Sequence, residues 1–403
     1  MAASDGVVII GAGIIGLATV YYLTELKDTP APSIHLVEAS PELFASASGF
    51  GPATASLGVL SFKLHRELAE KHDGRNRWGY SRSTGTSLTH DGRLNGARGD
   101  DWLRDDGSRA QSAAEHDFSG PSNAPAWLTR RAGDALDIIS SVDTTGQVDP
   151  LRLCQFLLQE LVSKGVKLHQ PSRVVKISRE ASNINGVIVE NVSTKHTETL
   201  SCDRVVITAG AWSGRVFGEL FPDSDLNLHV GQLAGHSVVV KSPRWTAQHE
   251  TDGCHAVFTT LRSGFSPEIF SRVGGEIYIA GLNDPDLALP ELATDAVPDH
   301  ACIQELVQVS QRFLGQDGTD VSDLEVVRQG LCFRPITTSG VPIVSRIDPR
   351  RLGPAYTGQQ HGGVFVSTGH GPWGISHSLG TGKVMAELIE SRTTSADVMH
   401  LRL

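Results

Sequence analysis

The sequence of 403 residues predicts an α/β protein in which a domain with a parallel sheet is interleaved with a β-rich α+β domain. Three observations support this fold class. A buried apolar strand, a glycine-rich turn, a helix and a second apolar strand follow one another at the start of the chain. Similar strands that end in glycine-rich turns return in the middle and at the end. The blocks between them are richer in β-strand patterns, so one domain interrupts the other.

The first element is a Rossmann-like βαβ unit. Residues 7–10 are expected to form a buried strand, 14–26 a helix and 33–37 a second strand. The turn reads Gly11-Ala12-Gly13-Ile14-Ile15-Gly16, and Glu38 follows the second strand. In such turns the glycines allow a tight bend, a close approach to a pyrophosphate and close packing of the helix on the sheet. The helix N-terminus offers free N–H groups to phosphates, and the acid accepts hydrogen bonds from ribose hydroxyls. Dinucleotide binding is predicted, with a glycine turn that only packs a helix as the alternative.

From about residue 73 to 125 the composition changes, and Gly, Arg, Asp and Ser dominate. We expect loops of an inserted region here. A long segment without regular structure is either a lid over a binding site or a solvated excursion of the surface. The sequence does not decide between the two.

Regular patterns resume after residue 148. The expected elements are a helix over 151–164, strands over 167–168, 173–177, 186–190, 202–208, 237–240 and 276–280, a helix over 300–314, a strand over 363–367 and a helix over 380–390. The nucleotide-binding domain is assigned to residues 1–72, 145–225 and 325–403. The substrate domain is assigned to residues 73–144, a loop-rich insertion, and 226–324.

The composition excludes several classes of function. A net charge of −10 argues against nucleic acid or an anionic membrane as the partner. No apolar run approaches the roughly 20 residues that span a bilayer. The five cysteines and sixteen histidines show neither metal-ligand spacing nor a Cys-x-x-Cys pair, so no metal is expected. We therefore expect the cysteines to be reduced thiols, which are typical of an intracellular, cytoplasmic protein. The last three residues, Leu401-Arg402-Leu403, are only faintly similar to a peroxisomal address.

Three further segments follow in order along the chain. They are Ala209-Gly210-Ala211-Trp212-Ser213, Gly330-Leu331-Cys332-Phe333-Arg334-Pro335, and Gly369-His370-Gly371 with Gly380-Thr381-Gly382. In these segments the sequence resembles the D-amino-acid oxidase superfamily of FAD-dependent oxidoreductases, which includes glycine oxidase and sarcosine oxidase. The segments 60–69 and 78–80 make it most similar to fungal-type members, many of which have no assigned substrate. The resemblance extends over nearly the whole chain.

The resemblance implies FAD as the cofactor and a set of residues that bind it. These are Gly11, Gly13, Ile14, Ile15, Gly16, Glu38, Ala39, Ser46, Ser48, Gly49, Val174, Ala209, Gly210, Trp212, Cys332, Gly371, Gly374, Gly380, Thr381 and Gly382. Val174 would contact the adenine region through its backbone. The segment 380–382 is expected to open the final helix and to direct the helix N-terminus at the negative charge of the reduced flavin.

Cys332 and Arg334 each have two interpretations. The resemblance places Cys332 where sarcosine oxidases bind flavin covalently through sulfur, and a small buried cysteine is the alternative. Arg334 matches the arginine that binds the substrate carboxylate in D-amino-acid and glycine oxidases, a geometry that suits a guanidinium. A structural ion pair is the alternative for Arg334.

His370, Trp373 and Arg272 complete the candidate catalytic residues. After the segment 369–371, sarcosine oxidases carry a lysine and glycine oxidases an arginine as a second carboxylate anchor, whereas here Pro372 and Trp373 follow. A bulky ring suits an aromatic or alkyl amine better than a small zwitterion. His370 either lines the site or holds its own turn. Arg272 lies on a strand that faces the substrate in the family, or it is a solvent-exposed strand charge.

The resemblance implies an oxidase of a C–N bond in a secondary amine or an amino acid. Hydride passes to the flavin, water hydrolyses the imine, and oxygen as the acceptor yields peroxide. One alternative is a flavin dehydrogenase that oxidises a 2-hydroxy acid or uses another acceptor. A flavin-binding protein with a structural or regulatory role is a second, and an NAD(P)-dependent dehydrogenase a weaker third.

Overall fold

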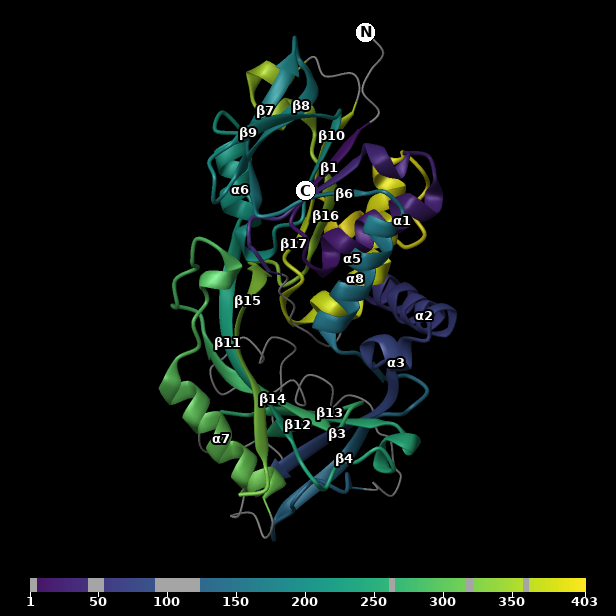
Figure 1. The fold of residues 1–403 in the computed structure, drawn as a ribbon, viewed down its shortest axis with the longest axis vertical. Helices are drawn as coiled ribbons and strands as arrows, with labels where there is room; N and C mark the ends of the chain where they lie inside the picture. Colours follow the sequence, from purple (N-terminus) through teal and green to yellow (C-terminus); the bar gives the residue numbers. More distant parts are fainter. Residues whose placement is uncertain (1–5, 43–53, 91–123, 261–264, 316–321, 358–361) are drawn as a thin grey trace.

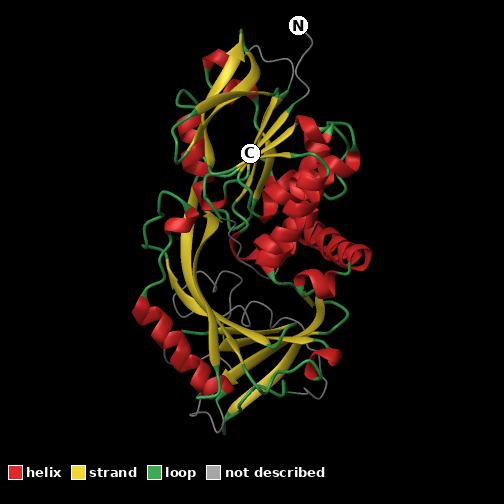
Figure 2. Cartoon of the chain, in the orientation of Figure 1, coloured by secondary structure: helices red, strands yellow, loops and turns green. Residues whose placement is uncertain are grey.

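The computed structural model describes residues 6–42, 54–90, 124–260, 265–315, 322–357 and 362–403. A parallel sheet with a layer of helices on one side forms one part of the molecule (Figure 1). A large curved sheet forms the other part, where strands predominate (Figure 2). The mixed α/β fold class predicted from the sequence is confirmed.

The first sheet is parallel except at one edge. Within the described ranges it has six strands in the order β16 (Ile343–Arg346), β17 (Gly363–Thr368), β10 (Arg204–Ile207), β1 (Val7–Ile10), β2 (Ile34–Val37) and β6 (Lys167–His169). β16 runs antiparallel to β17. Every residue of β1, β2 and β17 is buried, as expected for a sheet that is covered on both faces.

Helices cover one face of this sheet and a small antiparallel sheet covers the other. The helices are α1 (Ile14–Leu26), α5 (Pro150–Ser163) and α8 (Gly374–Ile389), and α2 (Ala55–His72) packs on α8. The small sheet consists of β7 (Ser172–Glu180), β8 (Asn183–Asn191) and β9 (Thr197–Ser201), with α6 (Ser213–Leu220) beside it. The predicted βαβ unit is therefore present, and α1 has the predicted bounds.

The second sheet is curved and nearly all antiparallel. Its described strands are, in spatial order, β15 (Glu325–Thr337), β11 (Val230–Lys241), β14 (Glu276–Asp284), β13 (Glu268–Arg272), β12 (Cys254–Thr260), β3 (Ser81–His90) and β4 (Asp134–Ser140), with β5 (Gly146–Gln147) paired to β3. Only the β12–β3 pair is parallel among these. Helix α7 (His300–Leu314) packs on the convex side against Ile277 and Ile279. Because strand side chains alternate, Tyr278 lies on the concave side.

Several short 3-10 helices connect these elements. They are η1 (Ala31–Ser33), η4 (Gly210–Trp212), η5 (His249–Asp252), η6 (Ala293–Asp295), η7 (Pro349–Arg351), η8 (Pro354–Tyr356), η9 (Gly371–Trp373) and η10 (Met399–Leu401). Helix α3 (Gly74–Trp78) precedes β3. No helix in the described ranges is long and apolar enough to cross a membrane.

The structure corrects the loop interpretation of residues 73–125. Residues 74–90 contain α3 and the ten-residue strand β3, and residues 91–123 lie outside the described ranges. β3 is rich in Ser and Thr, and Leu88 is its one strongly apolar residue. Pairing with β12 on one side and β4 on the other makes it a strand, and such long-range pairing is not visible in a local pattern.

Two further boundaries differ from the prediction. The nucleotide-binding domain was expected to resume at residue 325, but β15 begins there and pairs with β11 in the curved sheet. The final helix begins at Gly374 and not at Gly380, so the predicted start is wrong by nearly two turns. Glycines at 380 and 382 suggested a helix start, but they lie inside the helix, where they allow close packing.

Candidate active site

The turns after β1, β10 and β17 meet at the carboxyl edge of the parallel sheet. Thr208 Oγ1 donates to the carbonyl oxygens of Ile10 and Gly11 at 3.0 and 3.1 Å. Thr368 Oγ1 donates to the carbonyl oxygen of Gly210 at 2.8 Å. Segments that lie far apart in the sequence are thus brought to one edge, where open α/β sheets bind their ligands.

Three of the predicted cofactor-binding glycines leave free space around them. A Cβ added at Gly13, Gly210 or Gly374 would meet no atom of the described residues within 4 Å. At Gly16, by contrast, a Cβ would lie 2.0 Å from the carbonyl oxygen of Gly11, because α1 packs closely on the turn. Backbone N–H groups at a helix N-terminus with space in front of them fit a pyrophosphate-containing cofactor such as FAD.

The acid at the end of β2 is tied to the glycine turn. Glu38 Oε2 accepts from the Ala12 N–H and Oε1 from the Ser40 N–H, both at 2.8 Å. Burial raises the pKa of Glu38, and these two backbone N–H groups oppose that shift. A carboxylate can accept about four hydrogen bonds, so Glu38 retains capacity for ribose hydroxyls. Ala39 lies in the same turn, and Ile14 and Ile15 are buried at the start of α1.

The segment 380–382 is not at this edge. A Cβ at Gly380 would lie 2.8 Å from the carbonyl oxygen of Leu57 in α2, and one at Gly382 would lie 2.5 Å from Ala18 in α1. These small residues allow α8 to pack closely on two helices. The prediction that they open the final helix is wrong, and the helix N-terminus is formed by Gly374, just after Gly371 in η9.

His370 and Trp373 are both buried beside this turn. His370 Nε2 lies 3.2 Å from Thr381 Oγ1, and burial lowers the pKa of His370 to about 3, with a smaller contribution from His377. The ring is neutral and forms a hydrogen bond with Thr381 in α8. This favours the interpretation that His370 holds its own turn over the one in which it lines the site. Trp373 is 9% exposed, in η9, which packs against β15.

The remaining predicted cofactor residues are dispersed. Val174 is buried in the core between the small sheet and the parallel sheet. Trp212, which follows Ala209 and Gly210, donates its indole N–H to the carbonyl oxygen of Pro290 at 2.8 Å. The three residues predicted in the second flavin loop, Ser46, Ser48 and Gly49, lie outside the described residues.

Arg334 lies on the concave face of the curved sheet. Leu331 and Phe333 pack on the other side of β15 against η4, so the alternating residues Cys332 and Arg334 share the concave face. Arg334 is 8% exposed, and its Nη1 donates to Asn283 Oδ1 at 2.6 Å.

A glycine allows Arg334 to reach this partner. A Cβ at Gly235 would lie 2.8 Å from Arg334 Nη1, so the guanidinium crosses β11 over Gly235 to reach Asn283 in β14. No ion pair joins Arg334 to a carboxylate in the part of the chain that the structure describes. Among the described residues, the hydrogen bond to Asn283 therefore holds this guanidinium, and no ion pair does.

The electrostatics keep Arg334 charged. Burial acts to lower the pKa of Arg334, but Cys332, Tyr278 and Glu268 outweigh it, and the net pKa is raised. The pKa of Tyr278 is raised as well, chiefly by burial, so its phenol stays protonated. Among the described residues, the direct hydrogen-bond partner of this buried cation is a neutral amide, and the carboxylate of Glu268 acts on it only from beyond ion-pair distance. Such a cation suits an anionic ligand, because burying a charge without a direct counter-charge is costly.

Aromatic rings line the same face. Tyr278 stacks on Phe270 with ring centroids 5.9 Å apart, and Phe270 meets Phe258 edge-on at 5.4 Å. Sequence reasoning missed Tyr278. The alternation over 276–279 could have identified it, because Ile277 and Ile279 mark the buried face and leave Tyr278 on the other. We call Tyr278, Phe270 and Phe258 the aromatic wall.

Arg272 borders the aromatic wall, but it has an acidic partner. Its Nη1 lies 3.6 Å from Asp149 Oδ2, and its Cζ lies 4.5 Å from the centre of the Tyr278 ring. Burial lowers the pKa of Arg272, and Asp149 opposes that shift. Arg272 is 6% exposed, so the alternative of a solvent-exposed strand charge is wrong.

Cys332 is half-buried and lies two residues before Arg334. Its Sγ is 3.7 Å from the carbonyl oxygen of Gly235. Within the described ranges no group of three or more His, Cys, Asp or Glu side chains could hold a metal ion.

Comparison with known proteins identifies the family. The model of the DAO family, described as FAD dependent oxidoreductase, matches residues 6–388. The chain belongs to this family. The resemblance inferred from the sequence motifs is thereby confirmed.

Relatives of this FAD-dependent oxidoreductase include yeast and bacterial proteins. The Schizosaccharomyces pombe protein C1F5.03c is 26% identical, over 99% of this chain and 97% of its own length. Glycine oxidase of Geobacillus kaustophilus is 24% identical, over 68% of this chain and 63% of its own length.

Solved structures share the fold. The structure of Geobacillus kaustophilus glycine oxidase has a TM-score of 0.68 at 21% identity, over 98% of this chain and 97% of that one. L-amino acid deaminase from Proteus myxofaciens has a TM-score of 0.68 at 15% identity, over 100% of this chain and 94% of that one.

Proposed function

We propose that this protein oxidises a C–N bond in an amine or amino acid that carries a carboxylate, with FAD accepting the hydride and oxygen as the final acceptor. The observation that carries the proposal is Arg334, a buried guanidinium whose hydrogen-bond partner is Asn283 and which has no carboxylate partner in the described ranges. A substrate carboxylate would supply a direct counter-charge through two parallel hydrogen bonds.

In this proposal the protein contributes orientation and electrostatics. FAD supplies hydride acceptance when it is bound. Arg334 and Asn283 hold the carboxylate, and the protonated phenol of Tyr278 can donate a further hydrogen bond. The aromatic wall excludes water and packs against the apolar part of the substrate. The N-terminus of α8 at Gly374 provides a positive dipole end that favours negative charge nearby.

The relatives support a substrate of this class. Glycine oxidase, D-amino acid dehydrogenase and iminodiacetate oxidase are each named for a compound with both nitrogen and carboxylate. The aromatic wall and the bulky ring of Trp373 favour an amine larger than glycine. Trp373 also lies where a second basic residue would bind the carboxylate of a small zwitterion.

The test is anaerobic mixing of the purified yellow protein with a panel of carboxylated amines, their decarboxylated analogues and 2-hydroxy acids. We expect one carboxylated amine to bleach the flavin, and air to restore the colour quickly with release of peroxide. Slow return of colour in air would favour a dehydrogenase that uses another acceptor. Bleaching by a 2-hydroxy acid alone would contradict C–N oxidation, and no bleaching at all would favour a structural or regulatory flavoprotein.

Two finer features belong to the same proposal. A covalent flavin at Cys332 is tested by acid precipitation, in which colour in the pellet supports the link and a yellow supernatant rejects it. A cytoplasmic location is proposed over a peroxisomal one because Leu401-Arg402-Leu403 is only faintly similar to a peroxisomal address.

The two-domain partition also remains a proposal. We assign residues 1–72, 145–225 and 338–403 to the FAD-binding domain, and 73–144 and 226–337 to the substrate domain. The pairing of β15 with β11 supports the move of the boundary from 325 to 338.

A further inference from the structure

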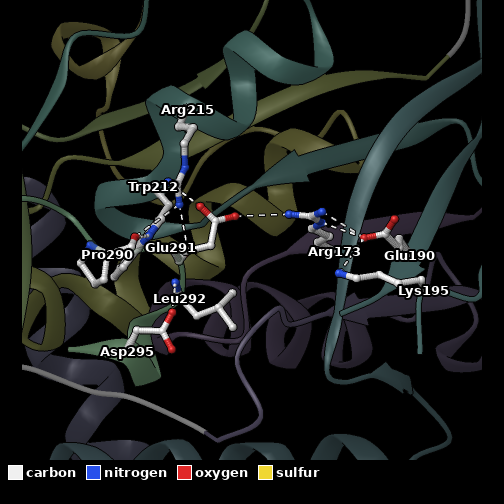
Figure 3. A network of polar contacts seen from close by, with 9 residues as sticks. All are labelled: Arg173, Glu190, Lys195, Trp212, Arg215, Pro290, Glu291, Leu292 and Asp295. Carbon is white, nitrogen blue, oxygen red and sulfur yellow. Dashed lines mark hydrogen bonds and ion pairs between the residues drawn. The ribbon is translucent and has the colours of Figure 1, made fainter. Parts of the chain in front are cut away.

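The segment 284–296 leaves the curved sheet and lies against the flavin-binding part of the molecule. It connects β14 to α7 and contains η6 as its only described helix or strand. It begins next to Asn283, which holds Arg334. Figure 3 shows its residues Pro290 and Glu291 in contact with side chains from η4, α6 and β7.

Glu291 joins the segment to two elements of the flavin-binding part. Its Oε1 lies 3.2 Å from Arg173 Nη1 on β7, and its Oε2 lies 3.1 Å from Arg215 Nη1 on α6 (Figure 3). Arg215 Nη2 also donates to the Glu291 carbonyl oxygen at 2.9 Å. Arg173 is the neighbour of Val174, the residue expected at the adenine region.

Two more hydrogen bonds reach the predicted flavin turns directly. The Trp212 indole N–H donates to the Pro290 carbonyl oxygen at 2.8 Å. The Ala293 N–H donates to Ser40 Oγ at 3.2 Å, and Ser40 donates its own N–H to the ribose acid Glu38. The segment thus contacts Trp212, in the turn after β10, and Ser40, which follows Glu38 at the end of β2.

The apolar side of the segment packs less tightly than a protein core. Leu287, Leu289 and Ala296 are half-buried against the small cluster that contains Phe333. The Glu291 side chain is 64% exposed, and exposed ion pairs contribute about 0.2–1 kcal/mol each. The attachment is therefore made of several weak contacts, and such a segment can open without unfolding the domains.

We propose that the segment 284–296 is a strap that retains FAD at its adenosine side, and that Glu291 is the positioning residue that keeps it closed. The proposal rests on FAD binding at the carboxyl edge of the parallel sheet. Besides lying at the predicted cofactor site, Ser40 and Trp212 would then hold the strap, because each forms a hydrogen bond to it. Opening of the strap would then limit the rate at which FAD leaves.

The test measures FAD release from the holoprotein in a Cys332→Ser background, where a covalent link cannot form. Free FAD is followed by its fluorescence after dilution. We expect Glu291→Gln to release FAD at least threefold faster, and Glu291→Lys, which repels both arginines, at least tenfold faster. Glu305→Gln, an exposed change on α7, is the matched control and should release FAD at the parent rate.

Rescue and salt dependence separate the strap from a general loss of stability. Adding Arg215→Glu to Glu291→Lys should restore part of the slow release, whereas Arg173 is left unchanged because it also pairs with Glu190 at 3.0 Å. Raising salt to about 0.5 M should speed release from the parent protein and not from Glu291→Gln, because salt screens exposed ion pairs. KM for the carboxylated amine at saturating FAD should stay unchanged.

Equal release rates for the parent, Glu291→Gln and Glu291→Lys proteins would overturn the strap. A purified parent protein without flavin would instead overturn FAD binding at this site, so the two failures are distinguishable. A changed KM with unchanged release would place Glu291 in substrate binding and would likewise contradict the proposal.

Discussion

The two large sheets bury their side chains in different ways. In the parallel sheet, strands β1, β2 and β17 are buried on both faces, and the predicted cofactor site is made of backbone at the strand ends. In the curved sheet, α7 covers one face, and the other presents side chains such as Arg334 and Tyr278 from the middle of strands. In the proposed function, backbone geometry would hold the cofactor and side chains would select the substrate. Changes in the two regions should therefore have separable effects.

The largest effect is expected from a side chain added to the cofactor region. Gly13→Val places a branched side chain in the space expected for the pyrophosphate, where a Cβ meets no protein atom within 4 Å. The chain should fold but lose roughly 100-fold in FAD affinity. Flavin content after gel filtration measures this. Gly218→Val, at an exposed glycine that also has no atom within 4 Å of an added Cβ, is the control and should keep its flavin. A Gly13→Val protein that stays fully yellow would remove Gly13 from the site.

Lowering the pH should destabilise the cofactor region before the curved sheet. Burial lowers the pKa of several described histidines there, to about 4 for His35, His65 and His377 and to about 3 for His370. The unfolded chain takes up protons below pH 6.5 while these groups stay neutral in the fold. The contribution of these groups to stability is therefore complete above pH 6.5 and falls as the pH decreases toward 4.

Hydrogen exchange at pH 7 and pH 5 checks the acid prediction. Amides of α2 and α8 should lose protection, and flavin should be released, before amides of β11 and β14 exchange. Loss of protection in the curved sheet first would contradict the assignment of the acid-sensitive groups to the cofactor region.

A smaller effect on stability is expected from Arg272. Arg272→Ala leaves the carboxylate of Asp149, which is 7% exposed, with Arg328 as its one remaining ion-pair partner among the described residues. Breaking a buried pair in this way costs about 3 kcal/mol, which should lower the Tm by several degrees. Arg334→Ala, on the same face but without a carboxylate partner in the described ranges, should leave the Tm within about 1 °C or raise it. Equal losses of Tm for the two variants would mean that Arg334 is also structural.

The sequence predicted the fold of the parallel-sheet region well because its signals are local. The glycine turn, the apolar strands and the bounds of α1 and α7 all follow from short-range patterns. Strand β3 was missed because its polar sequence becomes a strand only through pairing with β12 and β4. Tyr278 was missed because its role depends on which face of β14 meets α7. The glycines at 380 and 382 misled the prediction, since close helix packing and helix starts both favour glycine.

The most direct test of the account compares a carboxylated amine with its decarboxylated analogue, in the wild-type protein and in Arg334→Ala. The rate of anaerobic flavin bleaching is measured as a function of substrate concentration for each of the four combinations. Wild type should prefer the carboxylated amine at least tenfold in kcat/KM, which corresponds to about 1.4 kcal/mol, and Arg334→Ala should lose that preference. A preference that survives in Arg334→Ala would show that the carboxylate binds elsewhere and would contradict the assignment of the substrate to the concave face of the curved sheet.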